Sequence, residues 1–229
     1  MRTILFEGPG LNCLSTPLMT DVERQLDAAG DEPLLLKGAG RAFSAGLDLK
    51  EVTSLDLAGL ERFLAQLERL TSRLWSWPAP TVAWVNGHAI AGGCIMQLTA
   101  DLRLGSPHPK VRIGLNEVAL GLVFPPGILR MLALRLPPNG IVEAVLDAQL
   151  LAPEEAVRVG LLDGLVESEA EAVARLERLA AHPREAYAKT KAMLRPQLST
   201  PADWQAYVDG DLQRWGSAEA KERLLAVLR

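Results

Sequence analysis

Short segments of this sequence carry residues whose types and spacing suit acid–base chemistry on a small molecule. Glu117 lies downstream of the glycine pair Gly92-Gly93 and is flanked by apolar residues on both sides. Burial among apolar side chains raises the pKa of a carboxyl group towards neutrality, which makes it a better base at physiological pH. Two glycines at the start of a helix leave backbone N–H groups accessible to an anion. The combination predicts an enzyme that forms and protonates an enolate.

A further segment, residues 38–49, consists mostly of small residues and ends in Asp48-Leu49. Its glycine spacing is neither G-x-G-x-x-G nor that of a Walker A sequence, so we do not predict a nucleotide-binding loop. Small side chains allow the backbone to approach a ligand, but they also suit a tight turn between a strand and a helix that Asp48 would cap. The residues alone leave both interpretations open.

The other motifs also have structural interpretations. Close helix packing would explain Gly92-Gly93, and a surface or helix-capping role would explain Glu117. We expect His88 to be a hydrogen-bonded structural residue rather than a base. A basic cluster near the C-terminus is expected to form a solvated face, with contact to phosphate as the alternative. This cluster comprises Lys189, Lys191 and Arg195.

Composition argues against several classes of protein. The formal net charge is −4, and no stretch carries the clustered Lys and Arg that nucleic-acid phosphates require. Cys13 and Cys94 have neither CxxC spacing nor an accompanying histidine cluster, so we expect no metal site and no disulfide. Prolines and arginines interrupt the apolar window 118–136, and we therefore expect no membrane span. The start MRTILFEGPG lacks the apolar run of a secretory signal, which predicts a cytoplasmic location.

The elements that must position these motifs alternate between strands and helices over the first two thirds of the chain. Apolar residues at 34–37 and β-branched and aromatic residues at 81–85 predict buried strands. Leucines three or four residues apart predict an amphipathic helix over 57–74. A strand, a helix and a second strand in this order favour parallel strands joined by a right-handed crossover. Further expected elements are a helix over 18–29 and short strands at 102–104, 111–113 and 163–166.

Helix formers without any strand signal predict that the C-terminal third is helical. The expected helices cover residues 169–181, 183–198 and 201–228, and the last two begin with proline, which is favoured in the first helical turn. No flexible linker precedes them, so they should pack on the rest of the chain. We therefore divide the chain into an α/β core, residues 1–167, and a C-terminal helical region, residues 168–229.

Taken together, the strings GRAFSAGLDL, NGHAIAGG and IGLNEVALG resemble the crotonase superfamily, also called the enoyl-CoA hydratase/isomerase family. The resemblance covers roughly residues 3–200, with an N-terminus shorter than usual by an early strand. It implies an α/β fold, a spiral of ββα units whose helical C-terminal region takes part in trimerisation, as a homotrimer or a hexamer. It also implies an acyl-CoA thioester as substrate, so coenzyme A enters as part of the substrate and no separate cofactor is expected.

Carried over position by position, the resemblance implies a set of site residues. The backbone N–H groups of Leu47 and Gly92 would hold the thioester oxygen while Glu117 acts as the base. Such donors stabilise charge that develops only in the transition state. The segment 44–49 would also line the path of adenine and pantetheine. The further substrate-binding residues would be Ala42, Ser44, Ala45, Gly46, Asp48, Leu49, Gly93, Ile95 and Leu120.

One position departs from the hydratases of this family. A hydratase places two glutamates across its water, and the first of these positions is Ile95 here, which can neither hold nor activate a water. One glutamate is enough for a 1,3-proton shift, in which Glu117 removes a proton from C2 of a 3-enoyl-CoA and returns it to C4. An apolar Ile95 also keeps water away from the dienolate. The sequence thus predicts a Δ3,Δ2-enoyl-CoA isomerase of fatty acid oxidation.

Two alternatives remain open. One is another reaction of the crotonase type on an acyl thioester, namely hydration, decarboxylation or thioester hydrolysis. The other is a non-catalytic subunit that binds CoA thioesters. A second carboxylate facing Glu117, for instance Glu143 or Asp147, would favour the hydratase. The acyl pocket is expected to be built from scattered apolar residues such as Leu120, Val123, Phe124 and Ile128.

Overall fold

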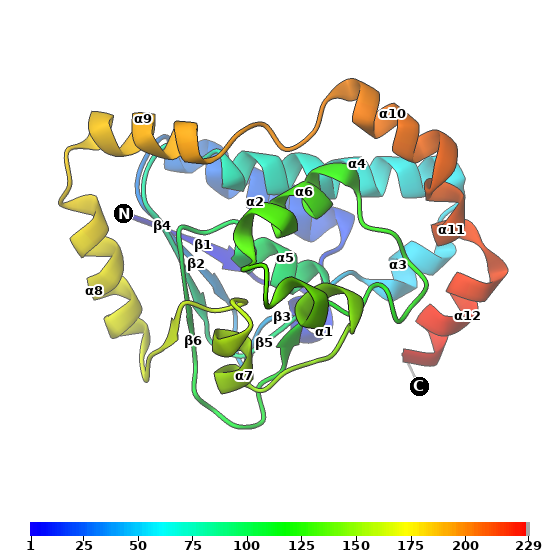
Figure 1. The fold of residues 1–229 in the computed structure, drawn as a ribbon, viewed down its shortest axis with the longest axis horizontal. Helices are drawn as coiled ribbons and strands as arrows, with labels where there is room; N and C mark the ends of the chain where they lie inside the picture. Colours follow the sequence, from blue (N-terminus) through cyan, green and yellow to red (C-terminus); the bar gives the residue numbers. More distant parts are fainter. Residues whose placement is uncertain (228–229) are drawn as a thin grey trace.

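A computed structural model describes residues 1–227 and shows two parallel sheets surrounded by helices (Figure 1). The strand order in the larger sheet is β1-β2-β4-β6-β8, and in the smaller sheet it is β3-β5-β7. The larger sheet comprises β1 (Arg2–Phe6), β2 (Leu34–Gly38), β4 (Thr81–Val85), β6 (Leu102–Gly105) and β8 (Gly164–Leu165). The smaller sheet comprises β3 (Ala42–Ser44), β5 (His88–Ile90) and β7 (Ile113–Gly114). The predicted α/β fold with parallel strands is confirmed.

The central strands match the sequence-based expectation closely. Every residue of β4 is buried, because a parallel sheet is covered on both faces and its strands are continuous apolar runs. β2 pairs with β4 in parallel, with Leu34 opposite Thr81. β7 is shorter than the strand predicted over 111–113. At the N-terminus, β1 forms the edge of the larger sheet beside β2.

Helices connect the strands of the core. The leucine-rich α4 (Leu57–Trp75) begins where the Asp56 carboxylate accepts a hydrogen bond from the N–H of Gly59, 2.7 Å away, and Pro78 follows its end. Its apolar face lies in the main hydrophobic core. The other helical elements of the core are α1 (Pro9–Asn12), α2 (Thr16–Ala29), α3 (Leu49–Ser54), α5 (Gly92–Leu98), α6 (Pro126–Arg135), the π-helical turn η1 (Val142–Leu146) and α7 (Pro153–Arg158). None of the helices within residues 1–227 is both long enough and apolar enough to cross a membrane.

The C-terminal region forms an arm around the core (Figure 1). Its helices are α8 (Glu169–Ala180), α9 (Arg184–Leu194), α10 (Pro201–Gly210), α11 (Leu212–Gly216) and α12 (Ala218–Val227). α8 packs on the larger sheet, where Leu176 joins a second apolar cluster with Leu35 and Val82. The single helix expected over 201–228 is wrong in the described residues. The chain bends at Asp211 and becomes extended at Ser217, so that α11 and α12 fold back over the core. Leu228, the predicted end of that helix, lies outside the described residues.

Two of the three side chains in the predicted basic cluster at α9, those of Lys191 and Arg195, are buried. Lys191 and Arg195 form ion pairs with Asp101 at 2.8 and 2.6 Å, and Tyr187 donates a hydrogen bond to the same carboxylate. The predicted solvated face is therefore wrong for these two residues, although Lys189 is exposed. Opposite charge on Asp101 compensates for the burial of the two cations. This network attaches α9 to the core.

Candidate active site

Glu117 occupies a buried turn after β7. Its backbone carbonyl accepts hydrogen bonds from the N–H groups of Leu120 and Leu122, which fold the following segment back on itself. The residue is only 4% exposed, and its Oε2 atom has no hydrogen-bond partner among the described residues. Burial raises the pKa of the Glu117 carboxyl to about 8, against the opposing effect of its own backbone N–H. The predicted burial is confirmed, and the group is suited to gain and lose a proton near neutral pH.

The N–H of Gly92 starts helix α5 beside Glu117. Ala91 precedes it with φ +48° and ψ −121°, a conformation that costs energy in a residue with a side chain and is typical of functional sites. Ile95 donates its N–H to the Ala91 carbonyl, which begins the helical hydrogen bonding. The Gly92 N–H has no acceptor among residues 1–227. It is therefore available to an oxyanion, and the start of the helix adds partial positive charge.

The N–H of Leu47 is the second predicted donor. The Leu14 N–H donates to the Gly46 carbonyl at 2.7 Å, and the Leu14 carbonyl accepts from the Asp48 N–H at 2.9 Å. In this parallel bridge the N–H of Leu47 points to the side away from Leu14. In residues 1–227 this N–H also lacks an acceptor. A Cβ on Gly46, where φ is +100°, would lie 3.6 Å from the Gly92 nitrogen and 2.9 Å from the Ile90 carbonyl oxygen. Glycine at this position lets the two donor segments approach each other.

A series of three cavities surrounds these groups, and Leu47 lines all of them. An outer groove of about 320 Å³ includes Asp48, Leu49 and Lys50. A central chamber of about 220 Å³ contains Glu117, together with Ala45, Leu49 and Leu120. An inner chamber of about 10 Å³ contains Gly92, Ile95 and Glu117. The structure thus brings the predicted base, both predicted donors and Ile95 to one continuous region.

Four predicted substrate-binding residues support this region from behind. Within residues 1–227, Ala42, Ser44, Gly46 and Gly93 line none of the three cavities. Ser44 donates a hydrogen bond to the Asn12 carbonyl, and a Cβ on Gly93 would lie 2.2 Å from the Ser44 carbonyl oxygen. These small residues let α5 pack tightly against β3. Asp48 caps α3 by accepting from the N–H groups of Lys50 and Glu51, as the structural interpretation predicted.

Glu117 is the one carboxylate among the described residues that line the central and inner chambers. Glu143 is paired with Arg158, and Asp147 accepts a hydrogen bond from Gln149 at 2.8 Å. Neither contributes to the pKa of Glu117. Ile95 is 2% exposed and lines the inner chamber beside Glu117. The site therefore has one acid and an apolar neighbour rather than two acids across a water.

His88 has the structural role expected from the sequence. Its Nδ1 atom accepts a hydrogen bond from the N–H of Arg112, which joins β5 to the loop before β7. Burial lowers the pKa of His88, and the nearby charges of Arg112 and Arg41 lower it further. His88 lies outside the three cavities among residues 1–227. It positions backbone rather than substrate.

Sequence reasoning missed the residues that the C-terminal arm contributes to the site. Trp215 of α11 lines both the central and the inner chamber, and Leu224 and Val227 of α12 line the central chamber. Asn116 also lines the central chamber, and its buried Oδ1 atom has no hydrogen-bond partner among the described residues. Nothing in the local sequence around Trp215 marks it, because its place depends on contacts with residues far away in the chain.

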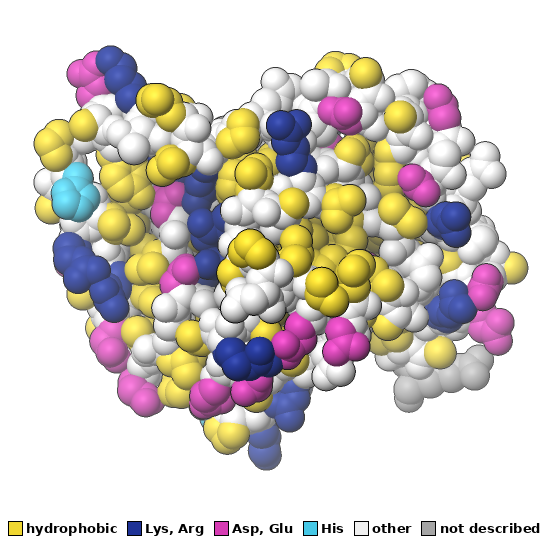
Figure 2. Space-filling model, viewed as in Figure 1, with side chains coloured by type: hydrophobic (Ala, Val, Ile, Leu, Met, Phe, Trp, Pro, Cys, Tyr) yellow, Lys and Arg dark blue, Asp and Glu magenta, His cyan; other side chains and the backbone are white. Residues whose placement is uncertain are grey.

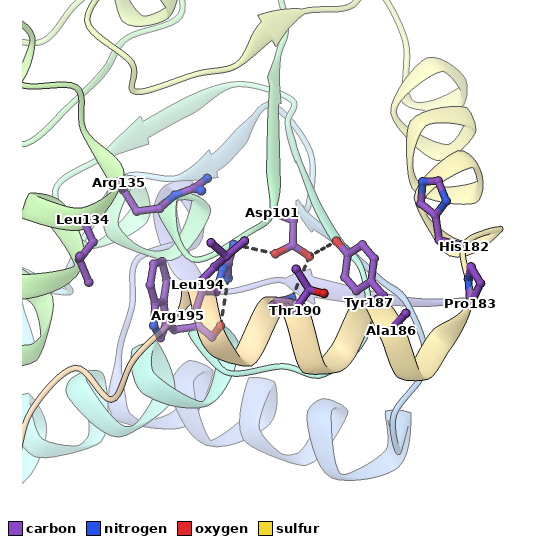
Figure 3. Close-up of a pocket in the computed structure, with 12 residues that line it drawn as sticks. Asp101, Leu134, Arg135, His182, Pro183, Ala186, Tyr187, Thr190, Leu194 and Arg195 are labelled. Atoms are coloured by element: carbon purple, nitrogen blue, oxygen red, sulfur yellow. Dashed lines mark hydrogen bonds and ion pairs between the residues drawn. The ribbon is translucent and has the colours of Figure 1, made fainter.

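A larger cavity, of about 570 Å³, lies between α6 and α9 (Figure 3). In Figure 3, Arg195 and Tyr187 point towards Asp101, and these are the contacts that attach α9 to the core. Its described lining contains neither Glu117 nor the two predicted N–H donors. Size alone therefore does not mark the candidate site, because the predicted base and donors line the smaller chambers. Within residues 1–227 no group of three or more His, Cys, Asp or Glu residues is placed to hold a metal ion.

Comparisons with known proteins agree with the fold and identify the family. The sequence model described as Enoyl-CoA hydratase/isomerase matches residues 2–224. The chain is 29% identical over 227 residues to human mitochondrial enoyl-CoA delta isomerase 1, covering 96% of this chain and 74% of that protein.

Solved structures extend the comparison. The crystal structure of human mitochondrial delta3-delta2-enoyl-CoA isomerase is similar, with a TM-score of 0.84, 28% identity and coverage of 99% of this chain and 92% of that one. An enoyl-CoA hydratase from Mycobacterium ulcerans is similar to nearly the same degree, with a TM-score of 0.82, 28% identity and coverage of 94% and 95%. The resemblance noted in the sequence is confirmed, and this chain belongs to the enoyl-CoA hydratase/isomerase family, the crotonase superfamily.

Proposed function

We propose that this protein is an enoyl-CoA isomerase that converts 3-enoyl-CoA to 2-enoyl-CoA in fatty acid oxidation. The observation that carries the proposal is the buried Glu117, the one carboxylate among the described residues that line the two chambers, beside two free N–H groups and the apolar Ile95. Proteins named as isomerases and as hydratases are similar to the chain at nearly equal identity, so the distinction rests on the site residues. A hydratase of this family uses a second carboxylate to activate its water, and the two chambers have no carboxylate besides Glu117 among the described residues.

The proposed reaction is a proton transfer within the substrate. The ionised Glu117 takes a proton from C2, and the C2–H electrons delocalise through C1 to the thioester oxygen. The N–H groups of Leu47 and Gly92 donate hydrogen bonds to this oxygen, where the negative charge of the dienolate develops. Protonated Glu117 then returns the proton to C4, so that the double bond moves from C3–C4 to C2–C3. Ile95 and the closed inner chamber keep water from the intermediate.

The outer groove provides a path for the coenzyme A part of the substrate. It begins at the Asp48–Lys50 segment, continues along Leu47 and Leu49 into the central chamber, and includes the cationic Lys50 at its entrance. Of the residues 44–49 for which the family resemblance implies a pantetheine path, Ala45, Leu47, Asp48 and Leu49 line this groove. We propose that coenzyme A binds here only as part of the thioester, without a separate cofactor or metal.

We also propose that the protein is a homotrimer or a hexamer. Apolar side chains gather over the middle of the face shown in Figure 2. Exposed apolar residues on α6, η1, α9 and the loop before α7 are Leu129, Leu134, Val142, Leu146, Leu150, Met193 and Leu194. Apolar surface of this kind is typical of subunit interfaces. The similar human isomerase is named as mitochondrial, and a cytoplasmic location for this chain stays a prediction.

The test is the conversion of 3-hexenoyl-CoA to 2-hexenoyl-CoA, measured in the wild type, in Glu117→Gln and in the matched control Glu143→Gln. We expect turnover in the wild type and in the control, because Glu143 pairs with Arg158 away from the chambers. We expect its loss in Glu117→Gln. Equal activity in all three proteins would refute Glu117 as the base. A wild type that binds the thioester without converting it would support a non-catalytic binding subunit instead.

A further inference from the structure

The inner chamber closes the path that leads from the outer groove past Glu117. The central and inner chambers share Leu47, Glu117 and Trp215, so a ligand that passes the carboxylate meets the inner chamber next. At about 10 Å³ the inner chamber has room for about one water molecule. Its other walls come from Leu67 of α4 and from Phe124-Pro125. The acyl path therefore ends shortly beyond the reacting carbons.

Hydrogen bonds fix the wall that Trp215 forms. The Trp215 Nε1–H donates to the Val123 carbonyl at 3.0 Å, and the Tyr207 hydroxyl donates to the same oxygen at 3.0 Å. Trp215 is 2% exposed and Phe124 is 5% exposed. Moving the indole aside would leave its buried N–H without an acceptor, and an unpaired buried donor is energetically costly.

Close packing fixes the same wall from the other side. A Cβ on Gly216, the residue after Trp215, would lie 2.7 Å from Cδ2 of Leu57 at the start of α4. Glycine therefore allows α11 to lie directly against α4, the helix that supplies Leu67 to the inner chamber. Packed interiors resist the insertion of extra methylene groups. The end of the acyl path is a packed wall rather than a gap.

We propose that Trp215 and Phe124 limit the substrate to short-chain acyl-CoA thioesters. This inference rests on the proposed function, which places C2 to C4 beside Glu117 in the central chamber. The inner chamber then holds roughly one or two further carbons, because its space equals about one water molecule. The acyl group that fits has roughly six carbons. Longer chains must displace Trp215 from Val123.

Binding of saturated thioesters tests this limit without depending on turnover. Each added methylene normally strengthens binding in an open apolar site, so a longer chain binds more tightly. We expect the reverse in the wild type, with hexanoyl-CoA binding roughly tenfold or more tightly than dodecanoyl-CoA, because the longer chain must force the packed wall apart. Dodecanoyl-CoA that binds as tightly as hexanoyl-CoA, or more tightly, would overturn the proposal.

Substitutions of Trp215 and Phe124 test whether these two side chains set the limit on acyl chain length. Trp215→Ala and Phe124→Ala should each bind dodecanoyl-CoA more tightly than the wild type does, by roughly tenfold, because the removed side chain leaves space for methylenes. Trp77→Ala is the matched control, since Trp77 is buried and donates its Nε1–H to a backbone carbonyl as Trp215 does, but lines neither chamber. This control should bind hexanoyl-CoA more tightly than dodecanoyl-CoA, as the wild type does. If both wall variants also keep the wild-type order, Trp215 and Phe124 do not set the limit. Isomerase turnover of the six-carbon substrate is measured in parallel, and its absence with the binding order intact refutes the proposed function alone.

Discussion

Replacing Glu117 by glutamine should abolish activity while making the folded protein less sensitive to alkaline pH. The wild-type carboxyl is almost completely buried, and this burial raises its pKa from 4.5 to about 8. Glutamine is similar in shape but does not ionise. General acid–base catalysis contributes about 100-fold to 10,000-fold to a rate, and we expect Glu117→Gln to lose activity within that range.

The effect on stability follows from the same pKa. Because the pKa of Glu117 is higher in the folded state than in the unfolded state, the unfolded chain releases this proton first as pH rises. The contribution of the Glu117 carboxyl to the free energy of unfolding is therefore full below pH 4.5 and is lost as pH rises through about 8. At about 1.36 kcal/mol per pKa unit, the wild type should lose about 4 kcal/mol relative to Glu117→Gln between pH 5 and pH 8.5. More than half of this loss should occur by pH 7.

Urea unfolding of both proteins at pH 5, 7 and 8.5 measures the difference directly. The pH profile of kcat/KM is the companion assay, since it reports groups of the free enzyme. It should rise about tenfold per pH unit up to about pH 8, because only the ionised Glu117 acts as a base. If the free energies of unfolding of the two proteins run parallel from pH 5 to pH 8.5, Glu117 is not desolvated and the reasoning is refuted.

Further substitutions test the donor, the neighbour and the support of the site. Gly92→Ala places a Cβ 2.8 Å from Cδ2 of Leu47, and kcat should fall about 100-fold, whereas Gly210→Ala, which meets nothing within 4 Å, should leave kcat unchanged. Ile95→Glu adds a second carboxyl in the inner chamber, so the pH profile of kcat/KM should move above pH 8, and an unmoved profile would show that the two acids do not interact. Asp101→Asn leaves two buried cations unpaired and should lower the free energy of unfolding by about 3 to 5 kcal/mol, with unchanged kcat per folded molecule. A loss below about 1 kcal/mol in urea unfolding would contradict this view of how α9 is attached.

The parts of the fold set by local pattern could be predicted from the sequence. The leucine spacing of α4 and the apolar run of β4 fix their structure locally, and both agree with prediction nearly to the residue. The burial of Glu117 was also predictable, because its apolar neighbours Leu120 and Leu122 in the chain line the central chamber with it. The basic cluster of α9 was not, because its partner Asp101 lies in a different element, at the end of the loop that precedes β6.

The C-terminal arm shows why the full site could not be predicted. Helix-forming residues dominate 201–227, and although Gly210 and Gly216 precede the bends at Asp211 and Ser217, they do not determine the direction of the chain after each bend. Those bends bring Trp215 over the inner chamber, where it bonds to Val123 and closes the acyl path. The position of Trp215 depends on tertiary contacts with α4 and with the segment after Glu117. No periodic pattern in the sequence indicates such contacts.

The product formed from a six-carbon substrate tests the central claim most directly. Wild-type protein is incubated with 3-hexenoyl-CoA, and 2-hexenoyl-CoA and 3-hydroxyhexanoyl-CoA are separated and quantified over time. A single buried acid with Ile95 beside it moves a proton without activating water. The account therefore predicts accumulation of 2-hexenoyl-CoA with little or no 3-hydroxyhexanoyl-CoA. Formation of 3-hydroxyhexanoyl-CoA as the main product would contradict it.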